Sequence, residues 1–151
     1  MRVADIDLTP LVKQLREDRV ALEVPNQTLE DHVAGALNPG TGLVILERTP
    51  AHIPAVRDLA QDLSMATGLD TVIVRTPHVA IAVSDSLTRA QVERGERAMV
   101  AQPDYGDGVR AFLSTSMETQ PAWPAIALII AAVAAAVVVA SWIATRRAFS
   151  S

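Results

Sequence analysis

An uncharged, apolar run near the C-terminus constrains this chain more than any other feature. Residues 125–145 read AIALIIAAVAAAVVVASWIAT and contain no charged side chain. A helix of that length covers the ~30 Å hydrocarbon core of a bilayer, and Trp and Arg are typical of its ends. Trp123, Trp142, Arg146 and Arg147 occupy those positions. The sequence therefore predicts a C-terminal transmembrane helix that contacts membrane lipid, with these four residues as its membrane anchor.

Composition divides the chain around this run. We expect a soluble domain at 1–118, a linker at 119–124, the transmembrane helix at 125–145 and a short basic tail at 146–151. All 17 Asp and Glu precede the run, whereas two of the 13 Lys and Arg follow it, so the domain carries a net charge of −6. An acidic domain does not attract nucleic acid.

Charge also predicts the orientation in the membrane. Lys and Arg next to a spanning helix stay in the cytoplasm. We therefore expect a single-pass protein of the cell membrane with an extracytoplasmic domain and a cytoplasmic C-terminus. The alternative is a cytoplasmic domain with a tail anchor, because residues 1–7 are charged and no apolar leader segment follows them.

Hydrophobic patterning in the soluble part predicts an α/β fold with a small mixed sheet flanked by helices. Continuous apolar runs indicate buried strands, whereas the 3.6-residue period indicates helices. A strand, a helix and a strand at this spacing form a right-handed parallel crossover, and the third strand returns antiparallel after a short turn. The expected strands are 43–47, 71–75 and 79–83, with a short β-prone run at 19–24, and the expected helices follow 9, 28, 52, 88 and 108.

Local signals predict where these helices begin and end. Thr9 and Thr28 stand where an N-cap belongs, and Thr88 with Gln91 matches a capping box. Gly68 is the expected stop of the third helix.

Three carboxylates are the candidate metal ligands. Asp85 follows the strand 79–83 directly, and Asp104 and Asp107 flank a glycine in a later loop. Oxygen ligands of this kind suit Ca²⁺ or Mg²⁺. The competing interpretation, which we favour, is that Asp104 and Asp107 cap the next helix. No catalytic residue and no other cofactor is predicted.

Two further patterns have ordinary explanations. His32, His52 and His78 show no i, i+4 spacing, so we expect polar surface rather than a metal site. Alanines at every fourth position in the apolar run would let two helices approach closely, which makes a homodimer through the span an open alternative.

The order of pieces from about Leu43 to Ser116 resembles the TPM-domain family of membrane-associated α/β modules. The segments that carry the resemblance are LVILERTP, MATGLDTVIV, the strand VAIAV with Asp85, and PDYGDG before a helix. One apolar segment followed by arginines is more narrowly similar to an actinobacterial single-span membrane protein branch of that family.

The resemblance implies two alternative functions. The first is an interaction and regulatory module of the cell envelope that binds a partner protein and controls a peptidoglycan hydrolase in cell wall remodelling. The second is a weak divalent-metal-dependent phosphatase of the TPM type, with Asp85, Asp104 and Asp107 at its metal site. His78 to Ser84 replaces the Arg- and Gly-rich stretch usual around the last strand of the family, which argues against the phosphatase.

Overall fold

The chain divides into two compact units, Met1–Glu118 and Thr119–Ser151. The structure, a computed structural model, describes residues 6–118 and 123–148, and within the second range it describes the side chains of residues 127–139 and of Trp142. Each unit is treated by itself below.

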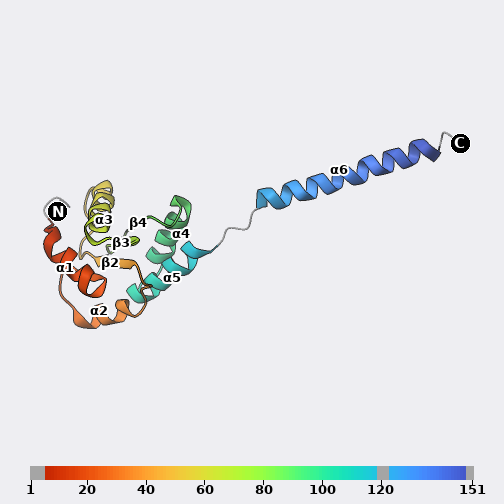
Figure 1. The fold of residues 1–151 in the computed structure, drawn as a ribbon. Coiled ribbons are helices and arrows are strands. Elements are labelled where there is room, and N and C mark those ends of the chain that lie inside the picture. Colours follow the sequence, from red (N-terminus) through yellow and green to blue (C-terminus); the bar gives the residue numbers. More distant parts are fainter. Residues whose placement is uncertain (1–5, 119–122, 149–151) are drawn as a thin grey trace. The chain divides into compact units, whose positions relative to one another are not determined.

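The first unit alternates helices and strands before it ends in two consecutive helices (Figure 1). Its elements in chain order are α1 (Leu8–Asp18), β1 (Val20–Leu22), α2 (Gln27–Ala34), β2 (Thr41–Ile45), α3 (Ile53–Thr67), β3 (Thr71–Arg75), β4 (Ala80–Ser84), α4 (Arg89–Val100) and α5 (Tyr105–Met117).

The strands form one four-stranded mixed sheet in the order β1-β2-β3-β4. β1, β2 and β3 are parallel, and β4 pairs antiparallel with β3, with Arg75 opposite Ala80 and Thr71 opposite Ser84. The mixed sheet and the parallel pairing of β2 with β3 are as predicted from the sequence. The β-prone run at 19–24 supplies β1, which the predicted sheet did not include.

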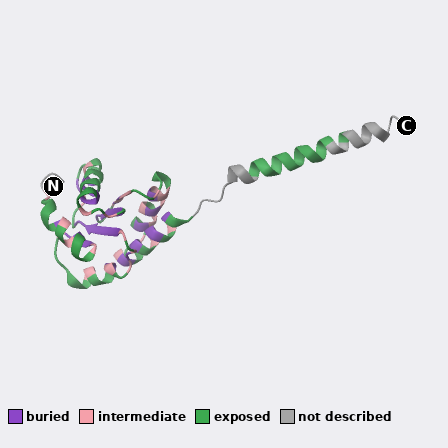
Figure 2. Cartoon of the chain, viewed as in Figure 1, coloured by how far each residue is buried: buried purple, intermediate pink, exposed green. Residues whose placement is uncertain are grey.

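Helices cover both faces of this sheet, so the unit has three layers (Figure 1). Because successive strand residues point to opposite faces, each strand contributes to two cores. Val44 and Val72 pack with α1 and α3 on one face, whereas Leu43 and Ile73 pack with α2, α4 and α5 on the other. The strands are buried at the centre of the layers (Figure 2).

The two parallel crossovers have opposite hands. β1, β2 and β3 lie side by side in chain order, but α2 packs on one face and α3 on the other. Two crossovers that step in the same direction and pass over opposite faces must differ in hand. One of them is therefore left-handed, a form found in only about 2% of such connections.

Some helix boundaries follow the predicted signals and others do not. Thr88 and Gln91 form the predicted capping box of α4, and Gly68 ends α3 with a φ of 71°. The predictions of Thr9 and Thr28 as N-caps are wrong. The caps are Asp7, which accepts from Thr9 N–H, and Asn26, which accepts from Leu29 N–H, because a carboxylate or amide two or three residues earlier has the better reach.

Each sheet edge has one outward-facing N–H satisfied by a helix side chain. On β1, Leu22 N–H donates to Gln14 Oε1 at 2.9 Å. On β4, Ala82 N–H donates to Glu96 Oε1 at 2.7 Å, and burial raises the pKa of Glu96. Such contacts occupy groups that an edge strand would otherwise offer to another chain.

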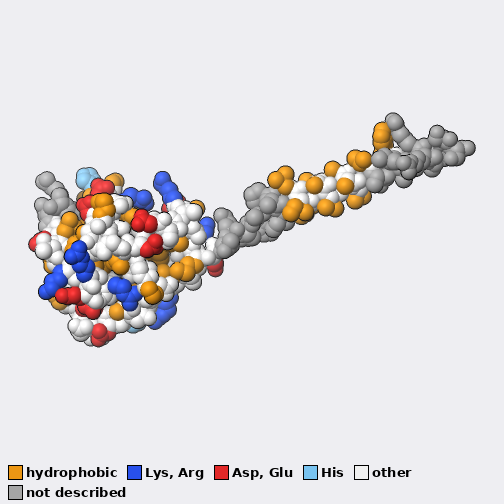
Figure 3. Space-filling view, viewed as in Figure 1, with side chains coloured by type: hydrophobic (Ala, Val, Ile, Leu, Met, Phe, Trp, Pro, Cys, Tyr) orange, Lys and Arg blue, Asp and Glu red, His pale blue; other side chains and the backbone are white. Residues whose placement is uncertain are grey.

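The second unit contains the helix α6 (Trp123–Ala148). Every described side chain from 127 to 139 is apolar and exposed (Figures 2 and 3). The prediction of a transmembrane helix at 125–145 is nevertheless corrected by the structure: within the described residues, no helix combines the length and apolarity that a membrane crossing needs. A span takes about 20 predominantly apolar residues.

Candidate functional site

The junction of β1 and β2 is the place where the topology favours a site. The chain leaves β1 toward the face of α2 and leaves β2 toward the face of α3. A crevice opens between the carboxyl ends of neighbouring strands whose connections go to opposite faces, and α/β proteins bind ligands in such crevices.

A groove of about 380 Å³ lies at this junction, and we call it the β1/β2 groove. Leu11, Leu22 and Leu46, all buried, give it an apolar floor. Asp7 and Glu23 supply carboxylates, and no basic side chain lines the groove among the residues that the structure describes. The groove is therefore apolar below and acidic at its rim.

Backbone hydrogen bonds hold the polar groups of the groove in place. Glu23 Oε2 accepts from Glu47 N–H at 2.8 Å, so this carboxylate bridges the ends of β1 and β2. Asp7 Oδ1 accepts from Thr9 N–H at 2.9 Å, and this bond lowers the pKa of Asp7. Gln14, whose side-chain oxygen accepts from Leu22 N–H, also lines the groove.

The carboxyl end of β3, by contrast, holds a buried cation. Arg75 is only 5% exposed, and its guanidinium donates to the carbonyls of Thr76 and Val79. The guanidinium carbon lies 5.6 Å from the centre of the Tyr105 ring, within cation–π range. Burial lowers the pKa of Arg75, and Tyr105 acts in the opposite direction. Within residues 6–118, no carboxylate forms an ion pair with Arg75.

A threonine pair closes the same end of the sheet. Thr49 Oγ1 and Thr76 Oγ1 lie 2.9 Å apart, which ties the segment after β2 to the turn between β3 and β4. Thr76 Oγ1 also accepts from Val79 N–H at 3.1 Å. We call Thr49, Arg75, Thr76, Val79 and Tyr105 the β3 cluster. Its groups are occupied by one another, as expected of a structural network.

Asp104 and Asp107 both lie at the start of α5, as the capping interpretation predicts. Asp104 is the N-cap and accepts from Asp107 N–H at 2.8 Å, and Asp107 pairs with Arg110 at 2.7 Å. The predicted loop at 104–108 is instead the first turn of this helix. A further contact, which no sequence pattern indicated, brings His32 Nε2 to 2.9 Å from Asp104 Oδ1.

The His32–Asp104 pair joins α2 to α5. The hydrogen bond from His32 is the largest cause of the lowered pKa of Asp104, followed by the bond from Asp107 N–H. Gly106 lets the ring approach, because a Cβ at that position would lie 2.6 Å from His32 Nε2. A larger residue at this position would require the His32 ring to move away.

Asp85 and the other two predicted metal ligands lie beside opposite ends of β3. Asp85 follows Ser84, which pairs with Thr71 at the start of β3, whereas Asp104 neighbours Tyr105 beside Arg75 at the end of β3. Four strand residues separate these positions by about 13 Å. In the described part of the chain, no group of three or more His, Asp or Glu side chains could hold a metal ion.

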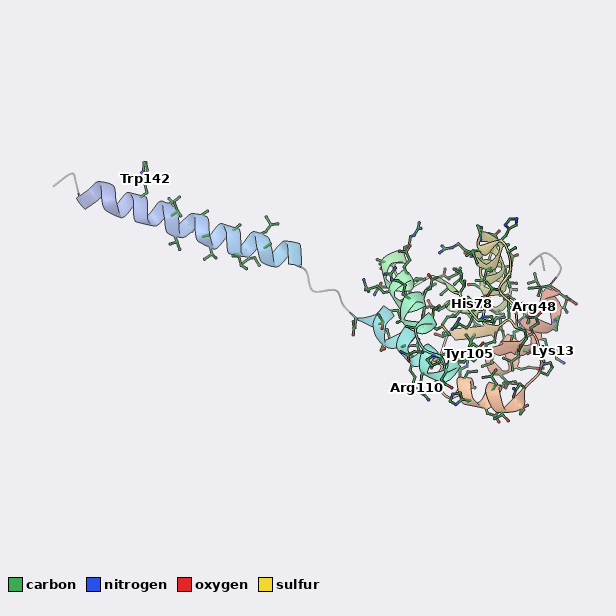
Figure 4. The ribbon with its side chains drawn as sticks, turned by 180° about the vertical axis from the view of Figure 1, so that it is seen from behind. Lys13, Arg48, His78, Tyr105, Arg110 and Trp142 are labelled. Carbon is green, nitrogen blue, oxygen red and sulfur yellow. The ribbon has the colours of Figure 1, made fainter. Side chains whose placement is uncertain are left out.

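The remaining predicted residues are placed as follows. His52 is the N-cap residue of α3, and His78 lies between β3 and β4 beside a hollow that Glu96 and Arg97 also line (Figure 4). Of the membrane-anchor residues, Trp142 is exposed on α6. The side chains of Trp123, Arg146 and Arg147 lie outside the described residues.

The fold and the groove define a small three-layer α/β module that precedes an apolar helix. The chain belongs to the family described as Membrane protein Rv1476, whose model matches residues 3–151 and so covers both units. No curated protein and no solved structure matches it. The family name makes the chain a membrane protein and names no activity, substrate or partner.

Proposed function

We propose that this protein is a membrane-associated module of the cell envelope that binds a partner protein there, with a peptidoglycan hydrolase as the partner class. The observation that carries the proposal is the surface of α6, where every described side chain from 127 to 139 is apolar and exposed. An exposed apolar patch of this size is characteristic of a membrane or protein contact.

The first part of the proposal is lipid contact through α6. Leu128, Ile129, Ile130, Val133 and Val137 are each at least 59% exposed, and burying side chains of this size stabilises a contact by about 1.5–3 kcal/mol each. The family to which the chain belongs is consistent with this contact.

The second part is that the first unit binds a partner rather than transforms a substrate. The β1/β2 groove holds two carboxylates on an apolar floor and has no neighbouring nucleophile or histidine among its described lining residues. The resemblance to TPM domains, some of which act by contacting other proteins, supports a regulatory role. We place the first unit on the extracytoplasmic side, where a hydrolase of the cell wall works.

Flotation of the full chain with phosphatidylcholine vesicles tests lipid contact. The wild type should float with the vesicles, whereas Ile130→Asp combined with Val137→Asp should remain at the bottom of the gradient. Met65→Asp combined with Met117→Asp, which changes exposed apolar residues of the first unit, is the matched control and should float. Equal flotation of the α6 variant would refute lipid contact through this helix.

Regulation is tested by adding the full chain in nanodiscs to candidate envelope hydrolases and measuring the release of dye from labelled peptidoglycan. The proposal is supported if the rate of dye release changes when the full chain is present and the change requires residues of the first unit. Unchanged rates for all of them would remove the regulatory role.

The alternative is the metal-dependent phosphatase, and its test is hydrolysis of p-nitrophenyl phosphate with Mg²⁺ or Ca²⁺ and with chelator. We favour the partner-binding role because Asp85 lies beside the start of β3, whereas Asp104 and Asp107 lie beside its end. Turnover that chelator abolishes would reverse that preference.

A further inference from the structure

We propose that the β1/β2 groove binds a basic side chain, lysine or arginine, presented by the partner protein. The inference deepens the proposed function by assigning it a site and a ligand chemistry, and it rests on the partner being a protein. Three independent observations carry it: the topology, the shape of the groove and its charge.

The topology supplies the crevice. Because the connections after β1 and β2 pass to opposite faces, no crossover helix closes the space above both strand ends. The residues at those ends, Leu22 and Leu46, line the groove. A ligand that enters here meets the backbone ends of two strands and the first turns of α1.

The shape suits one long side chain. A volume of about 380 Å³ over three buried leucines is at the small end of the range for ligand pockets. Lysine and arginine combine an apolar stem with a charged head, so the stem lies against leucine while the head remains near the surface.

The charge selects a cation. Glu23 and Asp7 each use one oxygen to accept a backbone N–H, which fixes the carboxylates before any ligand arrives. In residues 6–118 no ion pair neutralises either of them. An ammonium or guanidinium between them would receive charge-assisted hydrogen bonds, which are about twice as strong as neutral ones.

The surrounding domain strengthens the selection. The net charge of −6 before the C-terminal run attracts basic partners over a distance of about one Debye length. The buried cation Arg75 lies in the β3 cluster, where the carbonyls of Thr76 and Val79 and the Tyr105 ring surround it. No basic group lines the groove to compete for the same carboxylates within the described chain.

The test uses the isotope-labelled full chain in detergent micelles, titrated with N-acetyl-lysine amide and N-acetyl-arginine amide. We expect saturable shifts of the amide signals of Leu22, Glu23 and Glu47, with dissociation constants near millimolar. N-acetyl-norleucine amide, which has the stem without the charge, should bind at least about tenfold more weakly, a difference of about 1.4 kcal/mol.

Two variants remove charge without removing a hydrogen-bond acceptor. Glu23→Gln can still accept from Glu47 N–H, and Asp7→Asn remains a competent N-cap, so both should fold. Each should weaken binding of the lysine probe about tenfold. Glu93→Gln, which makes the same change on α4 where Glu93 pairs with Arg89, is the matched control and should leave binding unchanged.

Several results would overturn the inference. They are shifts that do not saturate, equal binding of the norleucine probe, or binding that Glu23→Gln does not change. Cadaverine binding as tightly as the lysine amide would assign the groove to small amines instead of a protein side chain. If a hydrolase is still regulated while the basic probes fail, this inference falls and the proposed function stands. If the probes bind but no hydrolase responds, the inference stands and the regulatory role in the proposed function falls.

Discussion

The two halves of the carboxyl edge of the sheet differ, although parallel strands of the same sheet form both. At the ends of β1 and β2 there is a groove with an apolar floor and two carboxylates. At the end of β3 there is instead a buried arginine, Arg75, whose guanidinium meets backbone carbonyls and a tyrosine ring beside a pair of threonines.

The side to which each connection turns explains the difference. The chain diverges to opposite faces after β1 and β2, which leaves the space above them open. After β3 it turns directly into β4, and Thr76 and Val79 fill the equivalent space. The ends of β1 and β2 are therefore open to a ligand, whereas the residues at the end of β3 stabilise the β3–β4 hairpin. The following variants test whether the halves really divide structure from binding in this way.

The largest effect is expected in the β3 cluster from Arg75→Met. Methionine fills part of the same volume but takes the guanidinium donor away from the Thr76 and Val79 carbonyls and removes the contact with Tyr105. The Val79 carbonyl keeps its bonds from Thr76 N–H and Thr76 Oγ1. We expect a loss of about 3 kcal/mol in the free energy of unfolding, measured by urea denaturation. A loss below about 1 kcal/mol would mean that the cluster does not stabilise the hairpin.

Thr76→Val should have an effect about half as large. The substitution is nearly isosteric and removes the hydroxyl that meets Thr49 Oγ1 and Val79 N–H. Two half-buried polar groups then lose a partner, which costs about 1–2 kcal/mol. The conservative Thr76→Ser keeps the hydroxyl and serves as the control in the same denaturation experiment. An unchanged stability of Thr76→Val would show that the hydroxyl does not stabilise the fold.

Asp104→Asn should produce a smaller, pH-dependent change beside the β3 cluster. The lowered pKa of Asp104 means that its ionised form stabilises the fold above the ordinary value of 3.8, and that this contribution disappears as the pH falls through the folded-state pKa. Asparagine still caps the helix but carries no charge. Unfolding curves of the two proteins should differ near neutral pH and converge in acid; a constant difference would exclude the charge as its cause.

Glu23→Gln should have the smallest effect on stability, within about 0.5 kcal/mol by the same measurement, because the amide oxygen replaces the acceptor for Glu47 N–H. The substitution is expected to weaken binding of the lysine probe instead of lowering stability. A loss above about 1.5 kcal/mol would make the groove a structural element like the β3 cluster and erase the contrast between them.

Pattern and local signals were sufficient for most of the fold. The runs at 43–47, 71–75 and 79–83 became β2, β3 and β4 because buried strands need continuous apolar residues, and the Thr88–Gln91 box placed α4 correctly. β1 is only three residues long, which gives too short a pattern to assign to a sheet. The opposite hands of the crossovers depend on which face each helix covers, and a single helix period does not determine that.

The site was less predictable than the fold. Asp104 and Asp107 were recognised as residues of a helix start, where Asp104 is the N-cap and Asp107 lies in the first turn, because that role depends on spacing along one helix. Glu23 and Gln14 gave no signal, since their roles arise from contacts between segments far apart in the chain. The run at 125–145 was predicted to be a transmembrane helix, and that prediction is wrong for the described residues, where no helix has the length and apolarity of a membrane span.

The divergence of α2 and α3 to opposite faces also decides how the first unit would come apart. Residues up to β2 bring α1 for one face and α2 for the other, and the residues from α3 onward do the same for their own strands. A cut in the segment between Leu46 and Ile53 would thus yield two sandwiches that meet along one strand ladder, Thr41 to Ile45 on one piece and Thr71 to Arg75 on the other. The helix contacts of α1 with α3 and of α2 with α5 lie on either side of that ladder. Fragments of this kind are suited to reassemble, which makes that loop a natural position for a split reporter.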